Sequence, residues 1–306
     1  MNLFNEQING EQDWEAVFLS VHAFTPLVEH IFAIENLTFV EVENLTPGTH
    51  VVFKVGEYVV KIYAPPESGI YDRDLGNHGL ALKTDLFTIQ RAHELNVPAL
   101  NVIASGTVED KYRFDYMITE FIESVEFATM TDADKIALGR KLRRITDIMN
   151  TPCEPFTDID VINDEIRHRV WDEYPEQFRK ERLSYIKSHD YGESVFIYGD
   201  LCGDNFLLTP HGEVYIIDFA PVIAPKIYEH AQVALDCGLD PLILQGYFED
   251  YTYDAFVDMC FNGLLILDYD PEMVEEIIGK PEEFQTLDDL RKRIKYGMRG
   301  VIDGKS

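Results

Sequence analysis

One stretch, residues 195–219, limits the fold of this chain more than any other part of the sequence. Three short apolar runs in it have the length and composition of β-strands: residues 195–197, 206–208 and 214–217. Glycine, aspartate and asparagine separate the first two runs, and Pro210, His211 and Gly212 favour a turn before the third. The pattern predicts a strand, an irregular polar loop and a hairpin that leads into Asp218.

The same stretch carries polar residues in a specific arrangement. Asp200 and Asn205 lie in the predicted loop, and Asp218 follows the predicted hairpin. Each residue by itself is explained by turn formation, since Asp, Asn and Gly all favour turns. Together, at this spacing, they are typical of phosphoryl transfer, in which one carboxylate orients or deprotonates the acceptor hydroxyl. The Asn and the second carboxylate then hold magnesium on the triphosphate.

The length of the chain limits the number of domains, and its charge limits the kinds of molecule that it can bind. A chain of 306 residues is long enough for two lobes or one large domain. Its formal net charge of −29 argues against binding to a nucleic-acid backbone or to an anionic membrane surface. General solubility explains such a charge, and an acceptor site that favours a cation is the sharper alternative.

The sequence gives no sign of export or of membrane insertion. No run approaches the roughly 20 apolar residues that span a bilayer. The first residues lack the basic and apolar regions of a signal peptide. The 4 cysteines are scattered and form no CxxC pair, which argues against a zinc site or a disulfide framework. We therefore expect a cytoplasmic protein.

The order of predicted elements indicates an α+β fold with two lobes. The first part is rich in strands and has one internal helix, and the second part is mostly helical. The boundary is expected near residue 122. Helices are expected at residues 12–35, divided at Pro26, and at 78–96 and 131–150; strands are expected at 39–42, 51–55, 58–63, 101–106 and 112–122.

With these residues identified, the chain resembles the aminoglycoside phosphotransferase and choline-kinase-like family. The family pattern His-Gly-Asp-x-x-x-x-Asn is matched by residues 198–205, except that Tyr198 stands where histidine is usual. The second family element is matched by Ile216-Ile-Asp-Phe219. The resemblance implies a protein-kinase-like fold, with an antiparallel β-sheet N-lobe and one main helix at residues 1–122 and a mostly helical C-lobe at residues 123–306.

The resemblance also assigns roles within the second lobe. It implies that Asp200 is the catalytic base or the group that orients the acceptor hydroxyl, and that Asn205 and Asp218 bind Mg²⁺. Tyr198 would affect the support of the loop rather than the chemistry. Glu229 stands where the family has an acid that anchors the catalytic loop, and a helix-surface glutamate is the alternative.

In the first lobe the main candidate is Lys61. A lysine is out of place in the apolar run Tyr58–Ile62 unless its ammonium meets an anion, although most lysines, such as Lys54, lie on the surface. Kinase-like folds use a strand lysine on the α- and β-phosphates, paired with an acid on a nearby helix. The resemblance implies Asp85 as this acid, in preference to Glu94 at the far end of the helix.

Three further residues are implied in nucleotide binding. Gly48 lies where the family has its nucleotide-covering loop and would let backbone N–H groups approach phosphate, although a plain hairpin turn is the alternative. Glu120 and Ile122 match the hinge between lobes, where their backbone groups would bond the adenine edge.

The resulting hypothesis is a small-molecule kinase that uses ATP, with GTP as the alternative nucleotide, and Mg²⁺. The acceptor is a small hydroxyl compound, aminoglycoside-like or otherwise cationic, or another sugar or alcohol. A non-catalytic nucleotide-binding protein or scaffold is the alternative, favoured by the departures at Tyr198, Asp85 and Glu229. A protein-serine kinase is less consistent, since no Ala-Pro-Glu segment is evident. The oligomeric state is not indicated.

Overall fold

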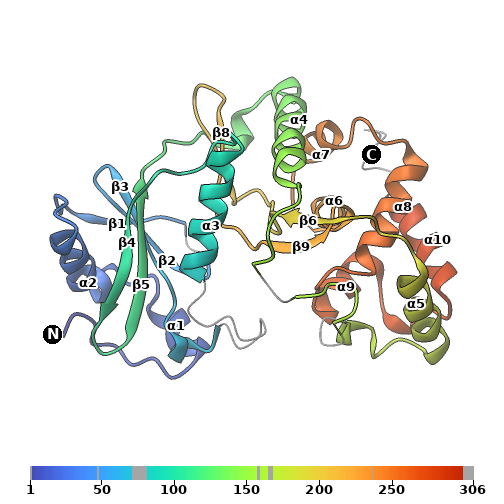
Figure 1. Cartoon of the computed structure of the whole chain (residues 1–306), viewed down its shortest axis with the longest axis horizontal. Coiled ribbons are helices and arrows are strands. Elements are labelled where there is room, and N and C mark those ends of the chain that lie inside the picture. Colours follow the sequence, from blue (N-terminus) through green and yellow to red (C-terminus); the bar gives the residue numbers. More distant parts are fainter. Residues whose placement is uncertain are drawn as a thin grey trace. The chain divides into compact units, whose positions relative to one another are not determined.

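The computed structural model of the protein describes residues 2–46, 48–70, 81–156, 159–164, 168–236 and 238–298. The chain divides into two compact units (Figure 1): Met1–His93 with Ala99–Glu123, and Glu94–Pro98 with Ser124–Ser306. The segment Glu94–Pro98 is tied to the second unit by the backbone N–H of Ile216, which donates to the carbonyl of Pro98 at 3.2 Å. A single boundary near residue 122, as expected from the sequence, would place this segment in the first unit.

The first unit contains an antiparallel sheet that has, within the described residues, five strands in the order β1-β2-β3-β5-β4. The strands are β1 (Val42–Asn44), β2 (Val51–Val55), β3 (Tyr58–Ile62), β4 (Val102–Glu109) and β5 (Arg113–Glu120). Gly56 makes the β2–β3 turn at φ 66°, a left-handed conformation that glycine adopts without strain. The expected meander is confirmed, but its first strand begins at Val42 rather than at residue 39.

Three helices of the described first unit accompany the sheet: α1 (Glu11–Val17), α2 (Val21–Ile34) and α3 (Ala81–Glu94). The expected division of the first helical region at Pro26 is wrong. The break lies at residues 18–20, where the Ser20 hydroxyl caps α2 by accepting from the N–H of Ala23 at 3.2 Å. Pro26 lies inside α2, where the helix loses one backbone hydrogen bond and continues. The helix expected at 78–96 is confirmed as α3, and residues 78–80 lie outside the described part.

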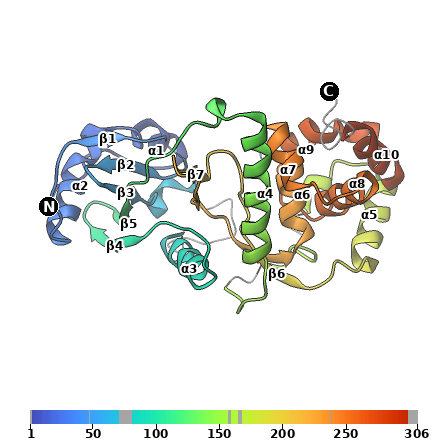
Figure 2. The ribbon, with the colours of Figure 1, turned by 90° about the horizontal axis from the view of Figure 1, so that it is seen from above.

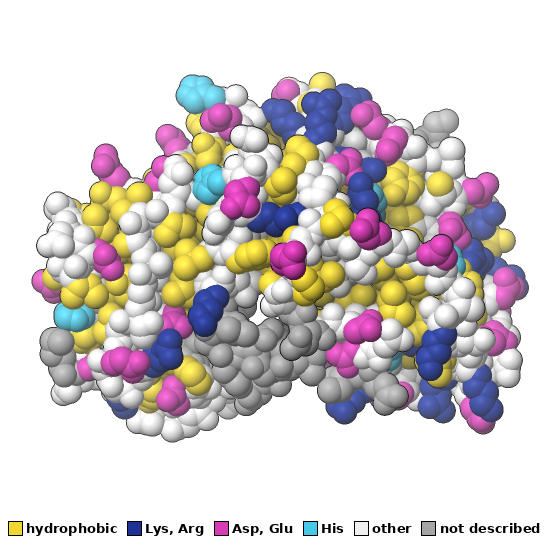
Figure 3. All heavy atoms as spheres, viewed as in Figure 1, with side chains coloured by type: hydrophobic (Ala, Val, Ile, Leu, Met, Phe, Trp, Pro, Cys, Tyr) yellow, Lys and Arg dark blue, Asp and Glu magenta, His cyan; other side chains and the backbone are white. Residues whose placement is uncertain are grey.

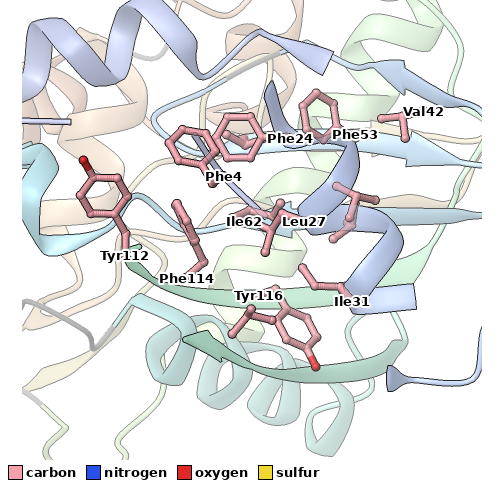
Figure 4. Packing of buried hydrophobic residues seen from close by; sticks show 14 of the residues in the cluster. Phe4, Phe24, Leu27, Ile31, Val42, Phe53, Ile62, Tyr112, Phe114 and Tyr116 are labelled. Atoms are coloured by element: carbon pink, nitrogen blue, oxygen red, sulfur yellow. The ribbon is translucent and has the colours of Figure 1, made fainter. Parts of the chain in front are cut away.

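The core of the first unit forms between α2 and one face of the sheet (Figure 4). Phe24, Leu27 and Ile31 recur at helical spacing and are fully buried on one side of α2. Phe53 and Phe114 meet them from the sheet, and the rings of Phe24 and Phe53 lie 5.9 Å apart. This burial gives the first unit a core of its own.

The described second unit is mainly helical and has two small sheets, β6 with β9 and β7 with β8. Its helices are α4 (Asp132–Met149), α5 (Glu176–Ser188), α6 (Ile227–Leu235), α7 (Pro241–Tyr247), α8 (Tyr253–Leu264), α9 (Pro271–Ile278) and α10 (Leu287–Gly297). Its strands are β6 (Ser194–Ile197), β7 (Phe206–Leu208), β8 (Val214–Ile216) and β9 (Val222–Pro225). The α+β architecture and the strand, loop and hairpin order expected from the sequence are confirmed.

Two glycines bring α4 and α7 into backbone contact, and Figure 2 shows the two helices side by side. A Cβ atom added at Gly139 of α4 would lie 2.0 Å from the carbonyl oxygen of Ile243. One added at Gly246 of α7 would lie 2.0 Å from the carbonyl oxygen of Ile136. Neither position has room for a side chain. The segment of α4 around Gly139 is therefore held against α7.

No single helix among the described residues is long and apolar enough to cross a membrane. Helices α1 and α2 meet the length and hydropathy limits only when taken together, and they are bent by 84° at the break between them.

The α4–α7 contact predicts an unusual response to alanine. Alanine favours a helix over glycine by about 1 kcal/mol, but in Gly139→Ala the methyl group would overlap a backbone carbonyl. We expect the free energy of unfolding in urea to fall by about 1–3 kcal/mol. The matched variant Gly297→Ala, with no neighbour within 4 Å at the end of α10, should be as stable as the wild type or more so. Equal stability of the two variants would contradict the close packing.

Candidate active site

The loop between β6 and β7 is held in place by a glycine that no other residue can replace. Gly199 has φ 88°, and a Cβ atom there would lie 1.8 Å from the carbonyl oxygen of Ala220. The N–H of Ala220 donates to the carbonyl of Tyr198 at 3.2 Å. The N–H of Ile217 donates to the carbonyl of Asn205 at 3.0 Å. These contacts bring the loop against the segment that carries Asp218.

Asp200 and Asn205 contact each other directly. The side-chain amide nitrogen of Asn205 donates to the Asp200 carboxylate at 2.7 Å and to its backbone carbonyl at 2.8 Å. This orientation leaves the amide oxygen of Asn205 as a ligand for a cation. Burial raises the pKa of Asp200, and the negative charges of Asp218 and Asp236 raise it further, against hydrogen bonds from Asn205 and Cys202. A carboxylate of raised pKa is a stronger proton acceptor.

Asp218 has an uncommon backbone conformation. Its φ of 47° lies in the left-handed region, which residues other than glycine rarely adopt. Such a conformation costs of order 1 kcal/mol or more and is concentrated at functional sites. Asp218 directly follows Ile217, whose backbone N–H donates to the carbonyl of Asn205. The two residues expected to bind metal are therefore on adjoining backbone segments.

Glu229 lies at the base of the loop and is completely buried. Its carboxylate accepts the backbone N–H of Tyr198 at 2.6 Å and that of Gly199 at 3.3 Å. It also accepts from the side-chain amide of Asn150, the C-cap residue of α4, at 3.1 Å. Burial raises the pKa of Glu229 to about 7, although the three hydrogen bonds favour the charged form. Glu229 is thus a buried residue of α6 that binds the backbone of the loop, and it is not a helix-surface glutamate.

The first unit pairs Lys61 with Asp85. The ammonium of Lys61 lies 3.0 Å from Asp85 Oδ2, and the two side chains are only 12% and 8% exposed. The same oxygen accepts the hydroxyl of Tyr63 at 2.6 Å. Sequence reasoning missed Tyr63. The available signal was its spacing, since residues 61 and 63 share one face of an extended chain.

The other three candidates of the first unit have less distinctive surroundings. Glu120 ends β5, its N–H donates to the carbonyl of Asn101 at 3.4 Å, and its carboxylate accepts the Asn101 side chain at 2.7 Å. Ile122 follows in an irregular segment and is partly buried. A Cβ atom at Gly48 would meet nothing within 4 Å, so the backbone there is open to approach. The nucleotide contacts of these residues remain predictions.

The donor set of the second unit suits Mg²⁺. Asn205 and Asp218 offer oxygen ligands, which Mg²⁺ prefers, and this ion usually takes one or two protein carboxylates together with substrate phosphates and water. Within the described ranges, no group of three or more His, Cys, Asp or Glu side chains is arranged to hold a metal ion. A cation at Asn205 and Asp218 would take its further ligands from substrate phosphates and water.

The sequence of residues 48–255 matches the profile of the phosphotransferase enzyme family. The chain belongs to this family. The enzyme class expected from the sequence, a phosphotransferase, is confirmed by the match. A search of curated proteins finds no significant match.

Solved structures of kinases share the fold of the chain. The streptomycin–ATP complex of aminoglycoside phosphotransferase APH(2")-IIa is 13% identical, with a TM-score of 0.55, and the match covers 92% of this chain and 95% of that one. Choline kinase LicA from Streptococcus pneumoniae is 16% identical, with a TM-score of 0.53 and coverage of 90% and 97%. The GDP complex of aminoglycoside 2'-phosphotransferase-IIIa is 15% identical, with a TM-score of 0.53 and coverage of 88% and 97%. The expected kinase-like fold is confirmed.

Glu229 predicts a specific pH dependence of stability. Its pKa in the folded protein, about 7, lies above the ordinary value of 4.5, so between these values the folded protein holds a proton that the unfolded chain has released. Its contribution to stability is complete below pH 4.5 and is lost as the pH rises through 7. We expect this loss to be on the order of 2–3 kcal/mol. Urea unfolding of wild type and Glu229→Gln between pH 5 and about 8.5 measures it, because the other titrating groups are common to both. Parallel pH profiles for the two proteins would contradict the prediction.

The backbone of Asp218 predicts a difference between two substitutions. Asp218→Gly and Asp218→Ala both remove the carboxylate, but only glycine adopts φ 47° without strain. We expect the Gly variant to unfold with a free energy about 1 kcal/mol higher than the Ala variant. Chemical denaturation of both proteins at one pH measures the difference. An Ala variant as stable as the Gly variant would argue against the left-handed conformation.

Proposed function

We propose that this protein is a small-molecule kinase that transfers the γ-phosphoryl group of ATP to a hydroxyl group. The observation that carries the proposal is the contact between Asp200 and Asn205, with Asp218 on the adjoining backbone segment. Asp200 would orient the acceptor hydroxyl and accept its proton. Asn205 and Asp218 would hold Mg²⁺, which neutralises phosphate charge when bound.

The first unit would supply nucleotide binding. Lys61, kept in position by Asp85 and Tyr63, would bind the α- and β-phosphates. Backbone groups at Gly48 would approach phosphate, and those of Glu120 and Ile122 would bond the adenine edge. ATP is the nucleotide we favour, with GTP as the alternative, since related structures carry ATP or GDP.

A cationic acceptor agrees best with the charge of the chain. The net charge is −29, and acidic side chains are visible on each unit in Figure 3. Near the loop, the negative charge of Asp236 acts on Asp200, and Glu276 and Asp270 act on Asp236 in turn. An amine-bearing acceptor would be attracted by this field. The similar structures include a streptomycin complex and a choline kinase.

The residues that depart from the family pattern, Asp85, Glu229 and Tyr198, all make specific polar contacts, and this weakens the non-catalytic alternative. Asp85 reaches Lys61 at 3.0 Å despite its shorter side chain. Glu229 accepts two backbone N–H groups of the loop. Tyr198 donates its hydroxyl to the Asn205 carbonyl at 2.8 Å. A decayed site would not be expected to keep all these bonds.

We also propose that the protein works in the cytoplasm. Cys202 and Cys260 are free thiols, which is typical of proteins from a reducing compartment.

Replacement of Asp200 tests the function. We expect Asp200→Ala to lower turnover by about 10²–10⁴-fold, the usual contribution of a positioned acid–base group, and to leave ATP–Mg²⁺ binding largely intact. Asp204→Ala, at an exposed position in the same loop, is the matched control and should turn over normally.

The assay measures ATP consumption with a panel of acceptors: an amino sugar, a choline-like amine and neutral polyols of similar size. Nucleotide binding is followed separately by thermal shift. Normal turnover by Asp200→Ala would refute the assignment. Binding of ATP–Mg²⁺ without turnover on any acceptor would support the scaffold instead.

A further inference from the structure

Tyr198 is a buried tyrosine at the position where the matched family pattern has histidine. Its side chain is enclosed and only 1% of the residue is exposed. The hydroxyl donates to the backbone carbonyl of Asn205 at 2.8 Å and also contacts the carbonyl of Ile217. Because a phenol has one proton, the two carbonyls share a single donor.

The two carbonyls belong to the segments that carry the expected metal ligands. Asn205 is itself one of these ligands, and Ile217 directly precedes Asp218. The segments are already joined by the N–H of Ile217, which donates to the carbonyl of Asn205 at 3.0 Å. The Tyr198 hydroxyl adds a second connection at the same carbonyl. The distance between Asn205 and Asp218 therefore depends on a bridge that includes Tyr198.

The other parts of Tyr198 are fixed as well. Its backbone N–H donates to Glu229 at 2.6 Å. Its ring meets Phe219, the residue after Asp218, at a centroid distance of 5.2 Å and nearly at right angles. The hydroxyl is thus carried by a side chain that has little freedom to move. A histidine ring is shorter than a phenol, so this backbone is spaced for tyrosine.

We propose that Tyr198 is a positioning residue, which sets the spacing of Asn205 and Asp218 through its hydroxyl and so controls the affinity for the metal–nucleotide complex. This inference rests on the proposed function, since it takes Asn205 and Asp218 as the metal ligands. Tyr198 does not itself touch the reacting atoms. Its hydroxyl acts through the two backbone segments.

The test compares Tyr198→Phe with Tyr247→Phe. Both changes remove one buried hydroxyl of the second unit, and the Tyr247 hydroxyl bonds Thr146 at 2.8 Å, within the α4–α7 contact. Both variants should therefore lose a similar amount of stability, about 1 kcal/mol. A difference between them in metal binding then reports on position in the site and not on a general loss of stability.

The direct readout is the binding of Mn²⁺, used as a paramagnetic probe for Mg²⁺, in the presence of a non-hydrolysable ATP analogue. We expect Tyr198→Phe to weaken this binding by about 10-fold or more, as is usual when a residue supporting metal ligands is changed. We also expect kcat to fall and the concentration of Mg²⁺ at half-maximal rate to rise, while KM for the acceptor stays within about two-fold. Tyr247→Phe should bind Mn²⁺ like the wild type.

Asp218→Asn separates failure of this inference from failure of the proposed function. If Asp218→Asn loses Mn²⁺ while Tyr198→Phe binds it as tightly as Tyr247→Phe does, the role of Tyr198 is refuted and the metal assignment stands. If the wild type binds no Mn²⁺ with the nucleotide analogue, or Asp218→Asn binds it unchanged, the proposed function fails first and the inference falls with it.

Discussion

The arrangement of the loop depends on one buried carboxylate. Glu229 has no exposed surface, yet it accepts two consecutive backbone N–H groups, those of Tyr198 and Gly199, and the side-chain amide of Asn150. A buried charge is tolerated only when hydrogen bonds replace its hydration. Here they come from the end of β6 and from the C-cap of α4, and Glu229 itself belongs to α6. Three elements distant in sequence are thereby tied at the point where the loop begins.

A second hydrogen bond of Asn150 helps to keep these donors in place. The Asn150 amide also donates to the carbonyl of Phe196 in β6 at 3.0 Å, so α4 and β6 are joined directly. The glycine contact of α4 with α7 leaves no side-chain layer that could readjust. A rigid support of this kind is what a site that works by positioning requires.

The sequence predicted the local features well because they are set by residues near one another. Strand, loop and hairpin follow from apolar runs and turn-forming residues. The contact of Asp200 with Asn205 arises within a single loop. The family resemblance added the pairing partner of Lys61, which no local pattern specifies. These parts needed no knowledge of the tertiary structure.

The features that were missed involve partners far apart in the sequence. Asn150 shows no signal in its own segment, and its partner Glu229 is 79 residues away. Strand β9 was not expected, since four residues that pair with β6 are too few to show a pattern. Pro26 misled the prediction because the rule against proline in helices describes a cost, which the buried face of α2 offsets.

Gly199 and Tyr198 are neighbours that differ in how strictly the structure limits the residue type at each position. At position 199 any side chain would collide with the carbonyl of Ala220, so a substitution of this glycine would disrupt the loop. At 198 the requirement is chemical, a donor that reaches two carbonyls, and more than one residue type can meet it if the backbone adjusts. Tyrosine at position 198 is thus compatible with this loop, although the family pattern that the sequence resembles has histidine there. A sequence search for distant relatives of this chain should therefore require Gly199 and Asp200 and allow any residue at position 198.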